Sequence, residues 1–181
     1  MSFTSMEQGT KEDWDVIITE TRALIALMPD KIMEMLRSLA EITTGFACDQ
    51  LHHSLMTATL AERDGASDEE IIISLCHDIG KTVSVPNHGP IAAEILRAYI
   101  SEDAYQVLRH HQQFQGAHYY QFLGAPTDLR EQWRETSWFP LAEKLVDRWD
   151  APAFDPDYPV KTLEAFEPLI RSFFAEPKQV I

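Results

Sequence analysis

Apolar residues recur every three or four positions along most of the chain, which is the spacing of one face of an α-helix. No stretch shows the alternation of apolar and polar residues that is typical of a half-buried strand. The pattern therefore predicts a series of helices, at roughly residues 12–28, 30–43, 48–63, 68–79, 88–100, 102–113, 116–123, 127–135, 138–149 and 162–174.

Capping residues and prolines mark several of the helix boundaries. Ser67 or Asp68 precedes an acidic first turn, and Ser101 precedes another predicted helix. Three prolines between residues 151 and 159 predict an extended loop. We therefore predict an all-α fold class, with many short helices around one core.

Length and composition narrow the class of protein. The chain has 181 residues, 45% of them hydrophobic, which is enough for one domain with a sizeable core. We expect a single domain over residues 1–181, with residues 1–11 as a flexible or loosely packed N-terminal segment. Two cysteines without paired spacing, Cys48 and Cys76, suggest reduced thiols.

Charge and hydropathy also limit the expected partners and location. The net charge is −14 and no basic patch is visible, so we expect no nucleic-acid partner. No apolar run reaches about 18 residues, so we expect no membrane partner. The N-terminus lacks the basic-then-apolar layout of a signal peptide, which makes the cytoplasm the expected location.

Asp78 is the first candidate for chemistry, because helical register places its carboxylate on an apolar face. It continues the line of Ile71 and Leu75, and therefore points towards the core. A buried, unpaired carboxylate costs roughly several kcal/mol, so Asp78 should face a cation, a metal or hydrogen-bond donors. His77 lies about 100° around the helix, so the pair can approach a metal from neighbouring directions. An incidental polar helix end is the alternative.

Register also distinguishes neighbouring histidines, although a histidine taken alone is more often a surface or core-edge residue. His111 continues an apolar line through Val107 and Leu108, whereas His110 follows more polar positions. His88 opens a predicted helix whose following apolar residues share its face, or it is simply a helix-start residue beside a proline-rich turn. We therefore expect His111 to point inward.

Two further pairs are less clearly separated by register. His52 and His53 both line up with apolar residues, so the pattern leaves the choice between them open. Asp150 follows Val146 at helical spacing, whereas Asp147 follows charged positions, and this gives Asp150 a moderate preference as the inward residue.

Four imidazoles and two carboxylates from five helices exceed what one tetrahedral zinc needs. They suit two first-row metals bridged by a carboxylate, and imidazole with carboxylate but no thiolate fits iron or manganese as well as zinc. The candidate metal ligands are His53, His77, Asp78, His88, His111 and Asp150.

This ordered set, together with the motif HDIG at residues 77–80, resembles the HD-domain superfamily over roughly residues 46–160. The resemblance implies a helical bundle with a metal centre between its core helices, and most members of the superfamily are phosphohydrolases. The stretches NHGPIAAEIL, HHQQFQGAHYYQFLG and RWDAPAFDPDYP are similar to a narrower group, the HD oxygenases that act on organophosphonates.

The narrower resemblance implies a mixed-valent Fe(II)/Fe(III) pair held by the six ligands, with Asp78 bridging and dioxygen as co-substrate. The implied reaction cleaves the C–P bond of a small organophosphonate, 2-amino-1-hydroxyethylphosphonate or its N-trimethylated analogue, giving glycine or glycine betaine and phosphate. It implies no catalytic residue beyond the diiron centre.

Departures from that group bear on the substrate. A tyrosine and a glutamate of the aminohydroxyethylphosphonate enzymes are replaced here by Thr43 and Phe46. In that group the glutamate helps to read the substrate's amine, whereas Phe46 could face a quaternary ammonium, which packs on aromatic faces. This favours the trimethylated substrate; the alternative is that Phe46 only fills core.

Three further positions are candidates for binding the substrate. Lys81 follows the HDIG motif and could pair with the phosphonate, although lysine is also common there in HD phosphohydrolases. Gln115 stands where some relatives have lysine, and it can still hydrogen-bond an anionic oxygen. Asp147 stands where some relatives have arginine, and it could add negative potential near an ammonium.

The same ligands allow two other functions. A metal-dependent phosphohydrolase would use them with a metal-activated water on a phosphate ester. A regulatory module would have lost catalysis, which the complete set of six ligands argues against. The sequence leaves the native metal, the oligomeric state and the N-substitution of the substrate open.

Overall fold

The computed structural model describes residues 3–178, and helices make up 69% of the structure. No strand occurs within these residues, so the predicted all-α class is confirmed. The α-helices are α1 (Lys11–Ile25), α2 (Met28–Ser38), α3 (Gln50–Arg63), α4 (Asp68–Cys76), α5 (His88–Leu96), α6 (Glu102–Tyr119), α7 (Phe139–Lys144) and α8 (Leu163–Phe173). Shorter 3₁₀ segments are Met6–Gln8, Leu39–Glu41, Ile79–Thr82, Val85–Asn87, Tyr120–Leu123 and Leu129–Trp133, and Leu145–Asp150 is a π-helix.

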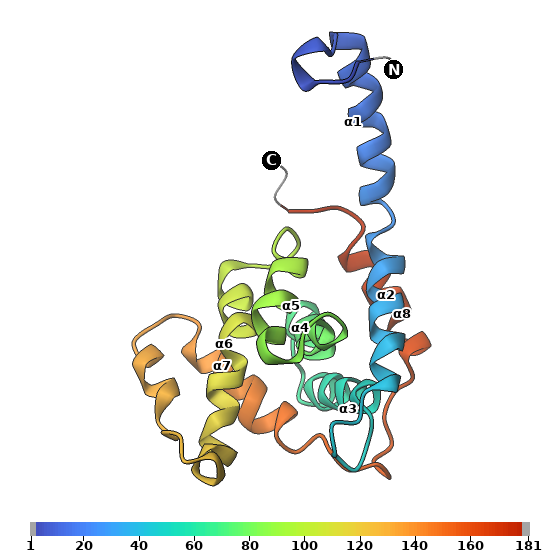
Figure 1. The fold of residues 1–181 in the computed structure, drawn as a ribbon. Helices are drawn as coiled ribbons and strands as arrows, with labels where there is room; N and C mark the ends of the chain where they lie inside the picture. Colours follow the sequence, from blue (N-terminus) through green and yellow to red (C-terminus); the bar gives the residue numbers. More distant parts are fainter. Residues whose placement is uncertain (1–2, 179–181) are drawn as a thin grey trace.

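Five elements surround the centre of the molecule. Helix α3 packs against α4 and against the π-helix, while α5 packs against α6, and α6 against α7 (Figure 1). Helix α2 packs against α8 on the outside of this group. Side chains such as Ile72, Leu75 and Trp149 are almost completely buried between these helices. The core therefore lies where α3, α4, α5, α6 and the π-helix meet.

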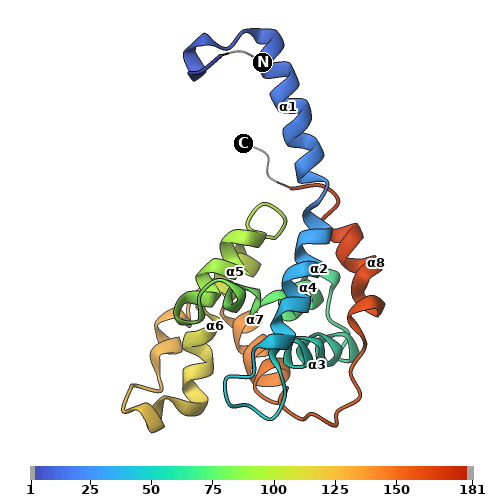
Figure 2. The same ribbon diagram turned by 45° about the vertical axis from the view of Figure 1, so that its right-hand side comes forward.

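Helix α1 stands apart from this core. It projects from the helical body in both views (Figures 1 and 2), and it buries no residue. The preceding segment Met6–Gln8 also buries none. Residues 1 and 2 of the predicted loose segment, 1–11, lie outside the described residues. The helical elements of the described N-terminal part, Met6–Gln8 and α1, contain no buried residue, so the loosely packed part extends beyond residue 11.

Two predicted helix boundaries are wrong. Residues 102–113 and 116–123 were expected to be separate helices, but α6 runs without a break through Gly116. This glycine is needed for packing, because a Cβ there would lie 2.5 Å from the ring of Tyr120. The predicted helix 127–135 is a 3₁₀ segment, Leu129–Trp133.

Three other segments also differ from their expected form. The predicted helix 68–79 ends as an α-helix at Cys76 and resumes as 3₁₀ at Ile79–Thr82. The predicted helix 138–149 changes from α to π after Lys144. Residues 151–159 form successive turns rather than an extended loop. Among residues 3–178, none of the helices combines the length and apolar character that a bilayer span requires.

Candidate metal centre

The structure brings all six predicted ligands together inside the core. They come from α3, the two residues that follow α4, the first residue of α5, α6 and the last residue of the π-helix. Each of the six is at most 5% exposed. They are His53, His77, Asp78, His88, His111 and Asp150.

Asp78 lies between two pairs of histidines, and each of its oxygens faces one pair. Its Oδ2 is 3.6 Å from His53 Nε2 and 3.4 Å from His77 Nε2. Its Oδ1 is 3.0 Å from His88 Nε2 and 3.7 Å from His111 Nε2. This carboxylate is therefore placed to bridge two neighbouring sites.

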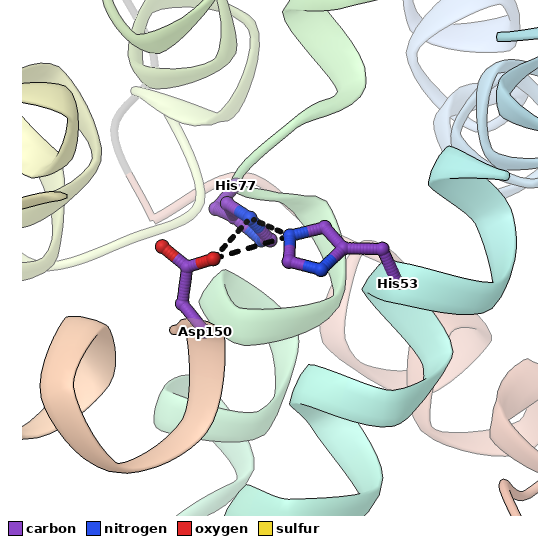
Figure 3. Close-up of side chains that lie close together, drawn as sticks. All are labelled: His53, His77 and Asp150. Carbon is purple, nitrogen blue, oxygen red and sulfur yellow. Dashed lines mark hydrogen bonds and ion pairs between the residues drawn. The ribbon is translucent and has the colours of Figure 1, made fainter. Parts of the chain in front are cut away.

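Asp150 completes the first of these sites (Figure 3). Its Oδ1 lies 3.1 Å from His53 Nε2 and 3.7 Å from His77 Nε2, and the two Nε2 atoms are 3.1 Å apart. We call His53, His77 and Asp150, with Asp78 Oδ2, the first cluster. The second cluster consists of His88 and His111, whose Nε2 atoms are also 3.1 Å apart, with Asp78 Oδ1.

The four histidines share one tautomer, which their backbone contacts impose. The Nδ1 atoms of His77, His88 and His111 lie 2.7–2.8 Å from backbone carbonyl oxygens three residues earlier. His53 Nδ1 lies 2.9 Å from the carbonyl oxygen of Ala153. A carbonyl only accepts hydrogen bonds, so each Nδ1 carries the proton and donates it. Each Nε2 therefore offers a lone pair to the centre, as in metal-binding histidines.

The two carboxylates, like the histidines, have atoms that face the centre and are free to bind a cation. The buried atoms Asp78 Oδ1 and Asp150 Oδ1 have no hydrogen-bond donor. Their neighbours in the centre are histidine Nε2 atoms, which in the neutral, metal-binding form of each ring point lone pairs at them and at each other. Buried polar atoms without partners are costly, and a metal ion between these atoms would satisfy all of them.

The spacing of the donor atoms fits metal ions. Nitrogen and oxygen ligands about 2.1 Å from one ion lie about 3.0–3.4 Å apart, and most distances within each cluster are close to this range. The first cluster offers four donors and the second three, so the second retains more open positions. The residues present therefore fit two metal ions, and their role as ligands stays a prediction.

Charge interactions set the protonation of the centre when no metal is bound. Burial acts to lower the pKa of His77, but the neighbouring carboxylates of Asp78 and Asp150 raise it to about 9. Burial acts to raise the pKa of Asp78 and of Asp150, but the surrounding imidazoles hold both below their usual range. Burial lowers the pKa of His111. A proton on His77 thus partly compensates the two carboxylates, and metal binding would release it.

The predictions of orientation from register are confirmed. His111 is fully buried, whereas His110 stacks on Trp138 and contacts Trp133 away from the centre. The choice between His52 and His53, which the pattern left open, is resolved by burial. His53 points inward, and His52 instead contacts the carbonyl oxygen of Asp155.

A cavity of about 440 Å³ adjoins the centre. His53, His88 and Asp150 form part of its wall, so a ligand in the cavity reaches both clusters. Thr44 also lines the cavity with a positive φ of 47°, a conformation unusual for threonine and frequent at binding sites. The cavity is large enough for a small-molecule ligand.

Phe46 lies on the cavity wall rather than in the core. Its side chain is 49% exposed, and its ring stacks on Phe154 at a centroid distance of 4.4 Å. Phe154 in turn stacks on His53 at 4.3 Å. The alternative that Phe46 only fills core does not hold, and its contact with substrate stays a prediction.

Lys81 and Gln115 both line the cavity, but in this structure each holds a carboxylate of the centre. Lys81 Nζ donates to Asp78 Oδ2 and to Gln50 Oε1, each at 2.6 Å. Gln115 Nε2 donates to Asp150 Oδ2 at 2.7 Å. Gln115 therefore holds Asp150 by the oxygen that does not face the clusters, whereas Lys81 holds Asp78 by Oδ2, the oxygen that also faces the first cluster.

Asp147 is not among the residues that line the cavity, which corrects the expectation that it faces the substrate. The π-helix turns its side chain away from the centre, where Arg130 Nη1 donates to both of its oxygens at 2.9 Å. His118 Nε2 donates to its Oδ1 at 2.9 Å. Arg130 offsets the negative charge that was expected to act on an ammonium.

Sequence reasoning missed several residues of the site. Gln50 is fully buried beside Lys81, and its position three residues before His53 on the same helix could have indicated it. Phe154 lies in a turn, where no periodicity reports orientation. His118 was one of seven histidines and gave no separate signal, but it lines the cavity.

These features define an all-helical protein with a buried His/Asp centre that could hold metal. The sequence model of the HD domain family matches residues 51–154, which is more than half of the chain and includes all six candidate ligands. The chain belongs to the HD domain family. HD domains are typically metal-dependent enzymes, and the buried cluster is compatible with that activity. None of the curated proteins compared with the chain matches it significantly.

Proposed function

We propose that the protein is a diiron oxygenase that uses dioxygen to cleave the C–P bond of a 1-hydroxy-2-aminoethylphosphonate. The substrate we favour is the N-trimethylated form, with glycine betaine and phosphate as products. The observation that carries this proposal is Asp78, whose two oxygens each face a separate pair of histidines. This arrangement suits two metal ions, and the motifs around it are similar to those of the organophosphonate oxygenases.

The ligand atoms support iron among the first-row metals without selecting it alone. Imidazole nitrogens and carboxylate oxygens, with no thiolate, are ligands that iron takes in non-haem centres. Both cysteines are buried, and neither belongs to the two clusters. When bound, the two irons would supply dioxygen activation and the oxidation of the substrate carbon.

The chain's own residues would bind and orient the substrate. Lys81 has one N–H beyond those given to Asp78 and Gln50, and it would donate that one to the phosphonate. The stacked rings of Phe46 and Phe154 would form an aromatic surface for the trimethylammonium group. Burial of the clusters would keep bulk water from the reacting carbon.

Oxygen uptake and phosphate release together test this proposal. The protein would be loaded with iron and ascorbate without oxygen, then supplied with oxygen and either 2-amino-1-hydroxyethylphosphonate or its N-trimethyl analogue. We expect oxygen consumption and stoichiometric phosphate release, faster with the trimethylated compound, and neither with His77→Ala.

A phosphate monoester assayed without oxygen provides the contrast. Hydrolysis of the ester, combined with no oxygen uptake on either phosphonate, would replace the oxygenase by a metal-dependent phosphohydrolase. A stoichiometry of one metal per chain after full reconstitution would also contradict the proposal.

A further inference from the structure

A chain of three charged or ionisable side chains runs to the cavity from outside the two clusters. Arg130, on the segment Leu129–Trp133, contacts both oxygens of Asp147 at 2.9 Å. Asp147 accepts a hydrogen bond from His118 Nε2 at 2.9 Å. Of the three, only His118 lines the cavity, so the other two act on a ligand through its ring.

The contact with Asp147 fixes the orientation of the His118 ring and determines which of its two nitrogens is free. A carboxylate only accepts hydrogen bonds, so His118 Nε2 carries a proton and donates it to Asp147. The ring is thereby held at one edge, and Nδ1 is the nitrogen left for another partner. The side chain is 46% exposed and accessible to a ligand in the cavity.

Arg130 makes this arrangement suitable for an anion. Asp147 alone would repel an anionic ligand, but the guanidinium of Arg130 offsets its charge. Two further carboxylates, Glu131 and Glu143, lie 3.9 and 4.0 Å from Arg130 through its Nε and Nη2 atoms. Neither contacts His118 in the described structure, so Asp147 is the carboxylate that the ring faces directly.

The other donors expected to bind the ligand are already partly engaged. Gln115 gives its amide to Asp150, and Lys81 shares its ammonium between Asp78 and Gln50. The ring is held in place by Asp147 through Nε2–H, so Nδ1 becomes a second N–H donor at the same cavity when a second proton joins the ring on binding of an anion. An imidazolium bound to an anionic oxygen forms a charge-assisted hydrogen bond.

We propose that His118 binds an anionic oxygen of the ligand through Nδ1–H, with Asp147 and Arg130 as its positioning residues. The ligand would be a phosphonate or a phosphate. This choice of ligand rests on the proposed function, whereas the contact between His118 and an anionic oxygen does not. The inference also holds for a phosphohydrolase, because a phosphate ester presents the same oxygens. Two residues of α6, His118 and Gln115, would then lie near the anionic end of the ligand, whereas the sequence had indicated only Gln115 on this helix.

Equilibrium binding to the metal-loaded protein tests this inference without turnover. Titration calorimetry would give the affinities of inorganic phosphate, methylphosphonate and 2-aminoethylphosphonate for the unmodified protein, His118→Ala, His118→Gln and Asp147→Asn. Lys11→Ala, which removes a positive charge on the projecting helix α1, is the control for net charge. Metal content and the circular dichroism spectrum would be measured for every variant.

We expect His118→Ala to weaken all three ligands by about tenfold or more, because each loses the same charge-assisted bond. His118→Gln should weaken them less, because an amide still donates, and Lys11→Ala should change nothing. Unchanged affinities in His118→Ala at normal metal content would overturn the inference. A loss of affinity confined to 2-aminoethylphosphonate would overturn it as well, since His118 would then contact the amine and not the anionic oxygens. Failure of the oxygenase proposal would instead appear as absent oxygen uptake by the unmodified protein.

Discussion

Gln115 donates a hydrogen bond from Nε2 to Asp150 Oδ2 at 2.7 Å, while Asp150 Oδ1 faces His53 and His77 without a donor. The amide therefore selects which carboxylate oxygen is turned to the first cluster. Partners of this kind orient metal ligands, and their loss typically costs about 10–100-fold in metal affinity or activity.

Gln115→Leu should therefore weaken metal binding by about tenfold, because it leaves Asp150 Oδ2 buried without a donor and frees the carboxylate to turn. Competition with a chelator would measure the affinity, and Gln112→Leu, which changes a neighbouring cavity residue, provides the control. If metal affinity stayed normal and only the KM for substrate rose, Gln115 would be a substrate ligand, as the sequence had suggested.

His111→Ala should remove one of two bound metals and abolish turnover, because it takes one of the three donors from the second cluster. The matched change is His110→Ala on the same helix. It should lower stability through lost contacts with Trp133 and Trp138 but leave two metals bound. Elemental analysis of the reconstituted proteins distinguishes them, and two metals in His111→Ala would refute the second cluster.

The metal-free protein should lose stability as the pH rises from about 6.5 to 9. The pKa of His77 is raised to about 9 by Asp78 and Asp150 against the effect of burial, whereas an unfolded histidine has a pKa of about 6.5. Its stabilising contribution is therefore complete below pH 6.5 and lost as the pH passes 9. The free energy of unfolding should fall by roughly 3 kcal/mol over this window.

Urea denaturation at several pH values, in the presence of a chelator, would measure this decline. His77→Gln should remove most of the pH dependence, and metal-loaded protein should lack it because Nε2 then binds metal. A metal-free protein whose stability stays level or rises between pH 6.5 and 9 would show that His77 is not protonated in the fold.

Gly80→Ala should disrupt the second cluster, although Gly80 is not one of its ligands, by displacing the backbone of His88. A Cβ at Gly80 would lie 2.1 Å from the carbonyl oxygen of His88, so the backbone that carries His88 and the segment that follows Asp78 must move apart. We expect a loss of about 3 kcal/mol in stability and of one bound metal. Gly124→Ala is the control: its φ is +67° in open space, so only about 1 kcal/mol should be lost. Equal effects of the two changes would contradict this explanation of the HDIG glycine.

Phe46→Leu should discriminate between the two candidate substrates. Leucine keeps an apolar side chain but removes the aromatic face that would hold a quaternary ammonium, a contact worth about 0.5–2 kcal/mol. The KM for the trimethylated phosphonate should rise about fivefold, and that for the primary amine should change less. An equal rise for both would assign Phe46 to general packing of the cavity.

The sequence predicted the fold class and the inward orientation of most site residues because both depend on helical periodicity. Asp78 and His111 follow apolar lines, and both are fully buried. Prediction failed where side-chain packing changes local backbone structure, as at Gly116, where a glycine makes room for Tyr120 instead of ending a helix. It also failed for Phe154, since orientation in a turn depends on contacts that no periodic pattern records.

The expected roles of the polar cavity residues show a second limit. The positions of Lys81, Gln115 and Asp147 in the motifs suggested contact with substrate, but not which neighbours compete for their side chains. Asp147 instead pairs with Arg130, which lies 17 positions away in the sequence. Such pairings depend on the packing of distant elements, and a single sequence gives no signal for them.

The carbonyl that orients each histidine has a consequence for when the centre can form. For His77, His88 and His111 the accepting oxygen lies three residues earlier, so these rings are set as soon as their own turns form. For His53 it belongs to Ala153, 100 residues later. During synthesis, the first cluster therefore has to wait until the ribosome has released the chain beyond residue 153, long after its first ligand has emerged. A metal ion that met the nascent chain would find all the donors of the second cluster already synthesised, but not those of the first.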